Sequence, residues 1–485
     1  MTTAAAISSS PAAPATAAWS ELLRGRNGPR AVALTGGVAL HAVNVHIVTT
    51  VLPSVVQEIG GLDWYAWNTT LFVVASIVGA SLSVRLLAAC GPRGACLAAL
   101  ALFALGSTGC ALAPSMVWML TGRSVQGLGG GMLVALSYAL IRVVFAPPLW
   151  PRAVALVSGM WGVATLCGPA VGGLFAQAGA WRWAFWTLLP ACALQALLVA
   201  VQLRPAALRP RDAAAPLPRI AALQIALLAA SVLVVAAGSL SPALGWHVVG
   251  VLAGLALGAA AITRDRRCAV RLLPRGATSP GTPLGAIYAS VALLLIGTTT
   301  EIFVPYFLQT LHGHAPLMAG YLTAAMAVGW SVGSMLSSGR SSAAAVRLLR
   351  AGPILCASGL LALALLVPLG GGWPPGIGTP LVALALAAVG TGVGMGWPHL
   401  LARVLALAPQ GEEGTASAAI TTVQLYGMAL GAAVAGLVAN AAGLTHPGGV
   451  AGAQQAAALL FAAFALAPLM AARLALRITG AAGRV

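Results

Sequence analysis

Long apolar stretches separated by short polar connections run along almost the whole chain of 485 residues. A helix needs about 17 to 25 mostly apolar residues to cross a bilayer, and fourteen stretches reach that length. The pattern therefore predicts an all-α polytopic membrane protein with 14 transmembrane helices. The predicted spans are approximately 31–52, 68–87, 94–113, 117–140, 153–176, 183–203, 219–238, 244–263, 284–308, 317–338, 345–368, 379–402, 416–440 and 454–477.

The positions of the basic residues agree with this number of spans. All 25 basic side chains are arginine. Cytoplasmic loops of membrane proteins are enriched in basic residues. With both termini in the cytoplasm, Arg182 falls outside and Arg123 falls within a span, whereas every other arginine lies in a cytoplasmic connection or tail. An error of one span would scramble this partition, so we expect both termini to be cytoplasmic.

The two longest basic connections divide the chain into two bundles. Residues 1–30 form a predicted cytoplasmic tail, and residues 31–203 form a six-helix bundle. Residues 204–283 hold basic linkers around a two-helix insert, made of spans seven and eight. Residues 284–477 form a second six-helix bundle, and residues 478–485 form a cytoplasmic C-terminal tail.

A faint internal repeat supports two equivalent bundles. The fourth span of the first bundle reads Gly-Leu-Gly-Gly-Gly-Met over residues 127–132, and the fourth span of the second reads Gly-Thr-Gly-Val-Gly-Met over residues 390–395. Parallel repeats of this kind are typical of secondary transporters, whose substrate site lies near the midplane between the repeats.

The composition excludes several classes of protein. Only 7% of the residues are charged and 60% are hydrophobic, whereas soluble domains carry about 25% charged residues. A soluble enzyme, a secreted disulfide scaffold and a disordered chain are therefore excluded. The net charge of +17 would fit nucleic-acid binding, but the arginines fall between apolar stretches, so we expect a lipid bilayer and no nucleic acid as partner.

No cofactor or metal site is predicted. The seven cysteines show no paired spacing of the kind that holds a metal. The glycine runs lie within spans and are not followed by the lysine and hydroxyl residue of a phosphate-binding loop. The abundance of arginine, alanine and glycine is typical of a high-GC bacterial genome, so we expect a multi-pass protein of the bacterial inner membrane.

Glu301 is the acidic residue placed well inside a span. A carboxyl group within a membrane is costly and by default indicates a functional site. Pro305 has no amide proton for the carbonyl of Glu301, so the helix should be broken beside the carboxylate. An apolar surrounding favours reversible proton uptake near neutral pH. The alternative is a structural carboxyl group neutralised by hydrogen bonds.

Arg123 and Gln126 form a second candidate pair, in the fourth span. Gly127 and Gly131 follow Arg123 at steps of four residues, so the arginine projects from the same face as a stripe of small residues suited to close helix contact. We expect Arg123 to be a buried partner of a carboxylate or part of a proton relay. The alternative is that it reaches the outer headgroups.

The fifth span carries a third group of candidate residues. Gly162, Gly168, Pro169, Gly172 and Gly173 give it a small-residue face with a bend. This pattern predicts a tightly packed, hinge-like helix. Packing alone would also account for it, because small-residue stripes are common in membranes.

Polar and aromatic residues near the first span complete the candidates. His41 and Asn44 share one helical face, and histidine can relay protons near neutrality, although isolated polar residues also hydrogen-bond across helices. Six aromatic residues beside the outer span ends are expected mostly to anchor the chain at the membrane interface. They are Trp64, Tyr65, Trp67, Trp181, Trp183 and Trp186.

Together these motifs resemble the 14-span drug:proton antiporter branch of the major facilitator superfamily, over about residues 31–477. In that branch the fourth-span motif is associated with proton coupling, and the fifth-span motif separates exporters from symporters. The matching residues are Arg123-x-x-Gln126-Gly127-x-Gly129, Gly162 with Gly168-Pro169-x-x-Gly172-Gly173, Trp181-Arg182-Trp183-x-Phe185 with Pro190, and Val48-x-x-x-Leu52-Pro53.

The chain departs from that branch at two positions. The first-span motif usually carries an aspartate where this chain has Asn44. The loop after the second span usually carries an aspartate that latches the cytoplasmic side, and here residue 88 is alanine. With fewer acidic residues than the family pattern, Glu301 becomes the main candidate for proton binding.

The resemblance implies the major facilitator fold and a transporter that is not an enzyme. We expect a monomer that exports a small amphipathic or cationic compound by alternating access, in exchange for protons and driven by the proton gradient. Glu301 would carry the proton, with Arg123, Gln126, His41 and Asn44 as further coupling residues. Residues expected to line the substrate cavity are Trp161, Tyr306, Met326 and Trp330.

Three other functions compete with this hypothesis. A metabolite exporter or facilitator with weak or no proton coupling is favoured by the two departures. A membrane sensor or scaffold would need a domain outside the membrane, and a lipid-modifying enzyme would need a polar cluster at one interface. The sequence shows neither feature.

Overall fold

The computed structural model of the protein describes residues 18–203, 219–241, 243–372 and 376–480. Every regular element among these residues is a helix. Eleven of the helical segments are long and apolar enough to cross a membrane. The linker residues 204–218 and most of the predicted N-terminal tail lie outside the described residues.

The first bundle follows the predicted spans closely. A short helix α1 (Trp19–Leu23) precedes it, and η1 (Leu62–Trp64) and η2 (Pro147–Leu149) are short 3₁₀ turns in its connections. Its long helices are α2 (Asn27–Ile59), α3 (Trp67–Ala111), α4 (Met116–Val144) and α5 (Trp150–Gln177), and its last span consists of the short α6 (Arg182–Trp186) followed by α7 (Leu188–Gln202).

The second bundle follows a two-helix insert, α8 (Ala222–Gly238) and α9 (Leu244–Arg267). Two of its spans are interrupted helices rather than single ones. Its elements are α10 (Pro283–Thr298), η4 (Thr299–Phe303), α11 (Val304–His312), α12 (Pro316–Ser337), α13 (Ser342–Leu366), η5 (Gly370–Gly372), α14 (Gly378–Ala406), α15 (Glu413–Ala441), α16 (Gly449–Phe464) and α17 (Leu466–Gly480).

The predicted number of spans is confirmed once α3 is counted as two. Gly91 within α3 has a φ of 67° and a ψ of 177°, a conformation that glycine adopts readily, and Pro92 starts the next helix. The second and third spans therefore meet at a kink without a loop. Counting α3 as two spans turns the eleven segments into twelve spans. The 17-residue α8 and the 22-residue α12 are the remaining two of the fourteen.

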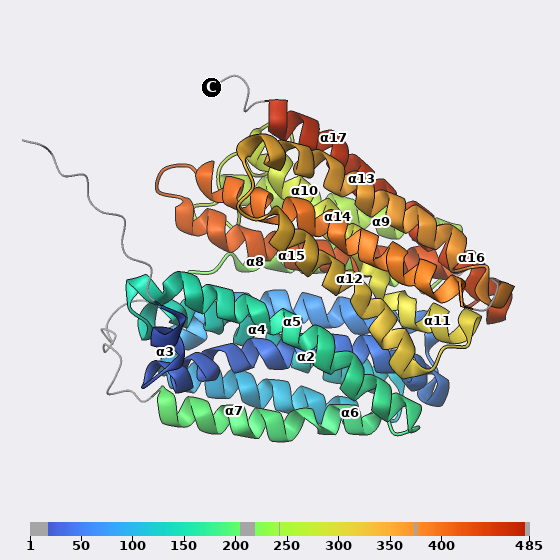
Figure 1. Ribbon diagram of the computed structural model, residues 1–485, viewed down its shortest axis with the longest axis horizontal. Coiled ribbons are helices and arrows are strands. Elements are labelled where there is room, and N and C mark those ends of the chain that lie inside the picture. Colours follow the sequence, from blue (N-terminus) through green and yellow to red (C-terminus); the bar gives the residue numbers. More distant parts are fainter. Residues whose placement is uncertain (1–17, 204–218, 242, 373–375, 481–485) are drawn as a thin grey trace, which may run out of the picture.

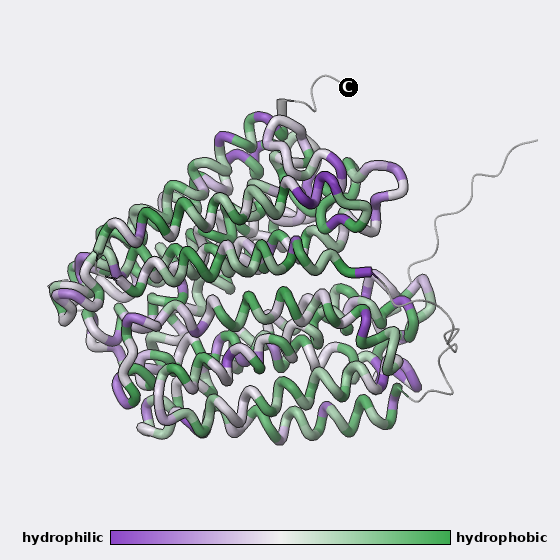
Figure 2. The backbone as a smooth tube through the Cα atoms, turned by 180° about the vertical axis from the view of Figure 1, so that it is seen from behind, coloured by the Kyte–Doolittle hydropathy of each residue, from purple (hydrophilic) through white to green (hydrophobic). Residues whose placement is uncertain are grey.

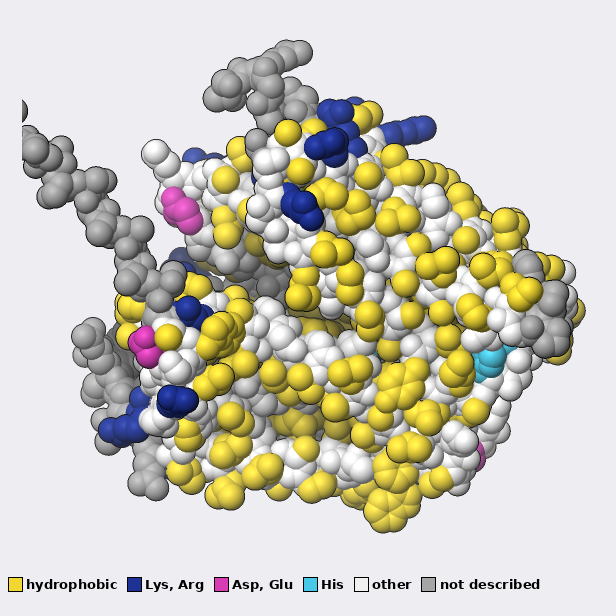
Figure 3. Space-filling view, in the orientation of Figure 1, with side chains coloured by type: hydrophobic (Ala, Val, Ile, Leu, Met, Phe, Trp, Pro, Cys, Tyr) yellow, Lys and Arg dark blue, Asp and Glu magenta, His cyan; other side chains and the backbone are white. Residues whose placement is uncertain are grey.

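The two bundles lie side by side and diverge from one end to the other (Figure 1). They meet near α11 and α16, which we name the closed end, and separate toward the end that carries α1, which we name the open end. The space-filling view shows a hollow between the bundles at the open end (Figure 3).

The bundles contact each other along two sides. Helix α5 packs against α12 on one side, and α3 packs against α15 on the other. Helix α8 of the insert touches both α3 and α15, and the three helices share a separate apolar cluster that includes Phe72, Val232 and Ala429. The insert therefore covers one of the two seams between the bundles.

The outer surface is apolar, as a lipid-facing surface must be. Hydrophobic residues run along the helices, and the polar ones concentrate near the helix ends (Figure 2). Leu244, Leu365 and Met335 are among the most exposed side chains, with Met335 75% exposed. An exposed apolar surface of this extent indicates contact with a membrane, so the chain is a multi-pass membrane protein.

Candidate functional site

Arg123 lies in the interior of the first bundle and is 2% exposed. Its Nε donates to the carbonyl oxygen of Asn68 at 3.2 Å, and one terminal nitrogen donates to Oε1 of Gln126. The guanidinium carbon stands 4.0 Å from the ring centre of Phe72. These contacts compensate a buried cation. The side chain is therefore not at the headgroups, and no carboxylate partner is found among the described residues.

Gln126 extends the hydrogen-bond network from α4 to α3. Its Nε2 donates to Oγ of Ser107 at 2.9 Å. The two helices can approach this closely because glycines face α3: a β-carbon on Gly127 would overlap the carbonyl oxygen of Phe72. The predicted small-residue face of the fourth span is thus a tight contact with α3.

His41 and Asn44 are both buried on α2, as their shared helical face predicts. The ring of His41 lies 5.2 Å from that of Phe72 and 6.0 Å from that of Trp161. Phe72 therefore stands between Arg123 and His41. Asn44 is 0% exposed, and neither of its amide atoms has a hydrogen-bond partner in the described part of the chain.

An unpaired buried amide is costly and needs an explanation. Nδ1 of His41 is also buried without a partner in that part of the chain. The two side chains lie three residues apart on α2 and so on one face. Both are available to a polar ligand or a water molecule, and of the two only the His41 ring can also bind a proton.

Glu301 lies where the ninth span breaks. Helix α10 ends at Thr298, η4 carries Glu301, and Pro305 falls in the first turn of α11. The amide of Val304 closes the turn on the carbonyl of Glu301. The carboxyl group is half-buried, and the two ion pairs of the described residues, Arg182 with Glu58 and Arg275 with Glu412, do not involve it.

The hydroxyl groups before Glu301 stabilise the break. Thr298 donates to the carbonyl of Leu295 at 2.8 Å, and Thr299 donates to that of Ile296 at 2.7 Å. These bonds add side-chain donors to carbonyls at the end of α10, where the backbone bonds are few; the Ile296 carbonyl also accepts from the amide of Thr299. The break is thus a built feature of the helix, and the carboxyl group at its centre has no counter-charge among the described residues.

The helix α5 runs along both bundles with its glycine face inward. A β-carbon on Gly168 would overlap that of His46 on α2, and one on Gly173 would lie 2.5 Å from the α-carbon of Leu317 on α12. Gly172 faces α2 in the same way, with Ile47 O 2.9 Å from its would-be β-carbon.

The other two residues of this motif differ in their surroundings. Pro169 contacts α12, because its Cβ would lie 3.2 Å from a β-carbon on Gly320. Gly162 has open space around it, with nothing within 4 Å of a β-carbon. The contact between bundles is therefore made by the second half of the motif.

The four residues expected to line one cavity lie in different places. Trp161 is partly exposed and touches His41. Tyr306 lies at the closed end against Tyr65, and Trp330 packs edge-on against Trp397 at 4.8 Å. Met326 is buried on α12, at the place where the backbone of α12 meets Gly390 on α14. The structure does not bring the four together.

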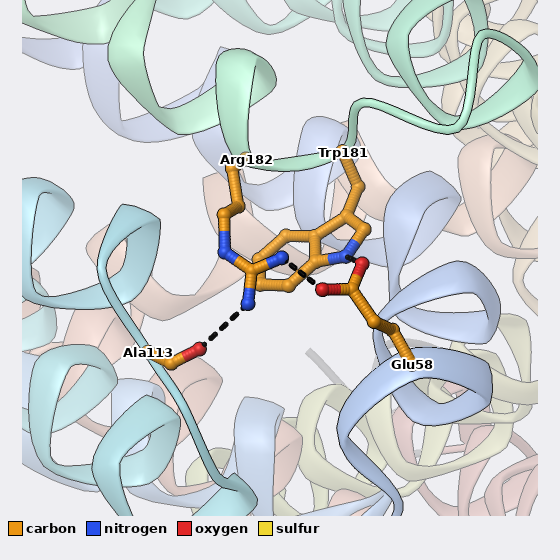
Figure 4. Close-up of polar contacts among 4 residues, drawn as sticks. All are labelled: Glu58, Ala113, Trp181 and Arg182. Carbon is orange, nitrogen blue, oxygen red and sulfur yellow. Dashed lines mark hydrogen bonds and ion pairs between the residues drawn. The ribbon is translucent and has the colours of Figure 1, made fainter.

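Two aromatic residues predicted to lie at the membrane interface are buried instead. Tyr65 and Trp181 are almost fully enclosed, whereas Trp183 is exposed as expected. Trp181 donates from Nε1 to Glu58 at 2.6 Å, and Arg182 pairs with the same carboxylate and donates to the carbonyl of Ala113 at 3.0 Å (Figure 4).

This group joins the ends of three helices. Glu58 is in the last turn of α2, Ala113 follows α3, and Arg182 begins α6. The sequence analysis named Trp181 and Arg182 as part of a motif but did not predict a partner for them. The partner is Glu58, which the scarcity of acidic residues, only 8 in the chain, could have indicated.

Comparison with known proteins identifies the family. Residues 34–432 match the Major Facilitator Superfamily. The chain is 41% identical over 432 residues to a "probable multidrug-efflux transporter" of Mycobacterium tuberculosis, covering 88% of this chain and 90% of the relative. It is 24% identical over 415 residues to "multidrug resistance protein 3" of Bacillus subtilis, covering 83% of this chain and 77% of that protein.

Solved structures share the fold. The structure is similar to a POT family transporter in complex with 5-aminolevulinic acid, with a TM-score of 0.67, 16% identity and coverage of 93% of this chain and 97% of the other. It is also similar to a D-xylose–proton symporter, with a TM-score of 0.62, 15% identity and coverage of 91% and 97%. The chain, a membrane transporter and not an enzyme, belongs to the Major Facilitator Superfamily.

Proposed function

We propose that the protein exports small amphipathic or cationic compounds across the bacterial inner membrane in exchange for protons. It acts as a monomer by alternating access, with both termini in the cytoplasm. The open end then faces the cytoplasm and admits substrate to the hollow between the bundles. The names of the mycobacterial and Bacillus relatives, which refer to multidrug efflux and resistance, support this substrate class.

The observation that carries the proposal is the unpaired carboxyl group of Glu301 at the break in the ninth span. A carboxyl group without a counter-charge in an apolar bundle gains little by staying ionised. It can therefore take a proton from one side and release it to the other when the bundles move. Arg123, Gln126, His41 and Asn44 are buried polar residues of the first bundle, and we propose that they tune this exchange.

The proton gradient supplies enough energy for export. Moving one charge through a potential of 100 mV releases about 2.3 kcal/mol. That energy corresponds to roughly fifty-fold accumulation per charge moved. One proton-binding carboxyl group is therefore sufficient for measurable drug resistance.

The test is drug accumulation in cells that express the wild type, Glu301→Gln or Glu413→Gln. Glu413 is an exposed carboxylate at the start of α15 and serves as the matched control. We expect Glu301→Gln to accumulate a lipophilic cation as cells without the transporter do, and Glu413→Gln to behave as the wild type. Full resistance with Glu301→Gln would overturn the assignment of Glu301.

A second candidate function is a facilitator or metabolite exporter with weak or no proton coupling. It is favoured by Asn44, a buried amide where the related branch usually has an acid, and by the absence of a carboxylate partner for Arg123 among the described residues. An uncoupler distinguishes the two functions. It should raise substrate accumulation in cells that express a proton-driven exporter and leave it unchanged for a facilitator.

A further inference from the structure

A short segment of the first bundle docks onto the second bundle at the closed end. This segment, residues 63–66, consists of the end of η1 and the two residues that precede α3. Nδ2 of Asn440 on α15 donates to the carbonyl oxygen of Asp63 at 3.1 Å. Ala66 lies so close to α15 that a β-carbon on Gly436 would stand 2.7 Å from its own.

Tyr65 is the central side chain of the docked segment. Its ring stacks on Phe303, with centres 5.0 Å apart and planes 24° apart, and meets the edge of Tyr306 at 5.6 Å. Phe307 continues the cluster behind Phe303. Tyr65 is 1% exposed, so an aromatic ring of the first bundle is enclosed by aromatic rings of the second.

The ring of Tyr65, and not its hydroxyl group, makes these contacts. The buried hydroxyl oxygen has no hydrogen-bond partner in the described part of the chain. Aromatic pairs in stacked and edge-to-face geometry are favourable beyond the area that they bury. A phenylalanine at this position would therefore keep the contacts, which gives a conservative variant with a defined expectation.

The docked ring rests on the turn that carries the candidate proton site. Phe303 and Glu301 both belong to η4, with only Ile302 between them. A 3₁₀ turn of five residues has few hydrogen bonds of its own. The position of the η4 turn therefore depends on the groups that pack against it. From the first bundle, the ring of Tyr65 packs against this turn.

We propose that Tyr65 is a positioning residue of the transport cycle, which seals the closed end and holds the turn of Glu301 in place while substrate enters from the open end. The proposal rests on the proposed exchange of substrate for protons. When Tyr65 leaves the aromatic cluster, the closed end opens and the Glu301 turn is released in the same step. Removing the ring should thus separate substrate movement from proton movement.

The first test measures protons moved per substrate in proteoliposomes, with ethidium as the lipophilic cation. We expect Tyr65→Ala to lower this ratio roughly tenfold, the effect of losing two aromatic pairs, and Tyr65→Phe to keep the wild-type ratio. A purely structural role would reduce the amount of active protein and leave the ratio unchanged. An unchanged ratio with Tyr65→Ala, or an equal loss with Tyr65→Phe, would overturn the proposal.

The second test does not depend on substrate or protons. The pair Ala66→Cys and Gly436→Cys should form a disulfide at the closed end after a shift of about 1 Å, because the two β-carbons would stand 2.7 Å apart and a disulfide holds them about 3.5–4.5 Å apart. We expect the rate of disulfide formation to fall roughly tenfold when Tyr65→Ala is added, and to be unchanged with Tyr65→Phe.

Trp183→Ala is the matched control for both tests, because Trp183 is a large aromatic residue exposed on α6. It should change neither the proton ratio nor the disulfide rate. Equal disulfide rates with and without Tyr65→Ala would overturn the docking role. If Glu301→Gln still moves protons while the disulfide rate falls with Tyr65→Ala, the proposed proton site fails and the docking role of Tyr65 stands.

Discussion

At the scale of single residues, Arg123 and Glu301 both lie within spans but differ in whether neighbouring groups compensate their charge. Arg123 is buried with a carbonyl, an amide and an aromatic ring around it. Glu301 is half-buried without a counter-charge among the described residues. A compensated cation keeps its proton through the transport cycle, whereas a carboxyl group without a counter-charge can gain and lose a proton. This difference explains why we assign the proton to Glu301.

Replacing Arg123 by lysine should be damaging although the charge is kept. A lysine cannot contact Asn68, Gln126 and the ring of Phe72 together, because it lacks the planar fork of donors. Losing one charged hydrogen bond costs about 1.5–3 kcal/mol. We expect a lower unfolding temperature in detergent and slower transport, with Arg264→Lys on the exposed end of α9 as the control. Unchanged stability and transport would contradict the described role of Arg123.

Replacing Asn44 by aspartate should strengthen proton coupling. The amide is fully buried with no partner in the described part of the chain, so a carboxyl group of the same size would fit and would bind a proton that the amide cannot. We expect more protons moved per substrate than in the wild type, measured in proteoliposomes. A ratio equal to that of the wild type would show that this position takes no part in coupling.

At the scale of helices, the glycines of α5 determine how closely this helix packs against its neighbours. Its glycines allow contact with α2 and α12, and so with both bundles. The glycines differ, however, in what surrounds them. Gly168 has no room for a β-carbon, whereas Gly162 has open space.

This difference yields a matched pair of substitutions within one motif. Gly168→Ala forces α5 away from His46 and should destabilise the protein by about 1–3 kcal/mol, as overpacking does. Gly162→Ala should be neutral or slightly stabilising, because alanine is a better helix former. Thermal unfolding in detergent and transport rates check both. Equal effects would contradict the described packing of α5.

At the scale of the whole molecule, much of the fold could be predicted from the sequence. The alternation of apolar spans with arginine-bearing connections gave the number of helices, because the bilayer fixes the length of a span. The kink at Gly91 and the break at Pro305 follow from glycine and proline chemistry. The way in which the bundles contact each other could not be predicted, because those contacts join residues far apart in the chain.

The candidate site shows the same limit. The burial of Arg123 and the helix break at Glu301 agree with expectation, whereas the bond from Arg123 to the Gln126 side chain was not predicted. Tyr65 was expected at the membrane interface, because an aromatic residue at a span end usually lies there. Its true neighbours, Phe303 and Tyr306, are more than two hundred residues away in the chain. Spacing along one helix carries no signal for such a contact.

Proton-coupled export through Glu301 is tested most directly by proton movement in proteoliposomes when a lipophilic cation is added, with wild type compared with Glu301→Gln. We expect substrate to trigger a proton flux in the wild type. We expect this flux to be lost in Glu301→Gln, while the amount of inserted protein stays the same. Substrate movement without proton flux in the wild type, or an equal flux in the variant, would contradict the role of Glu301.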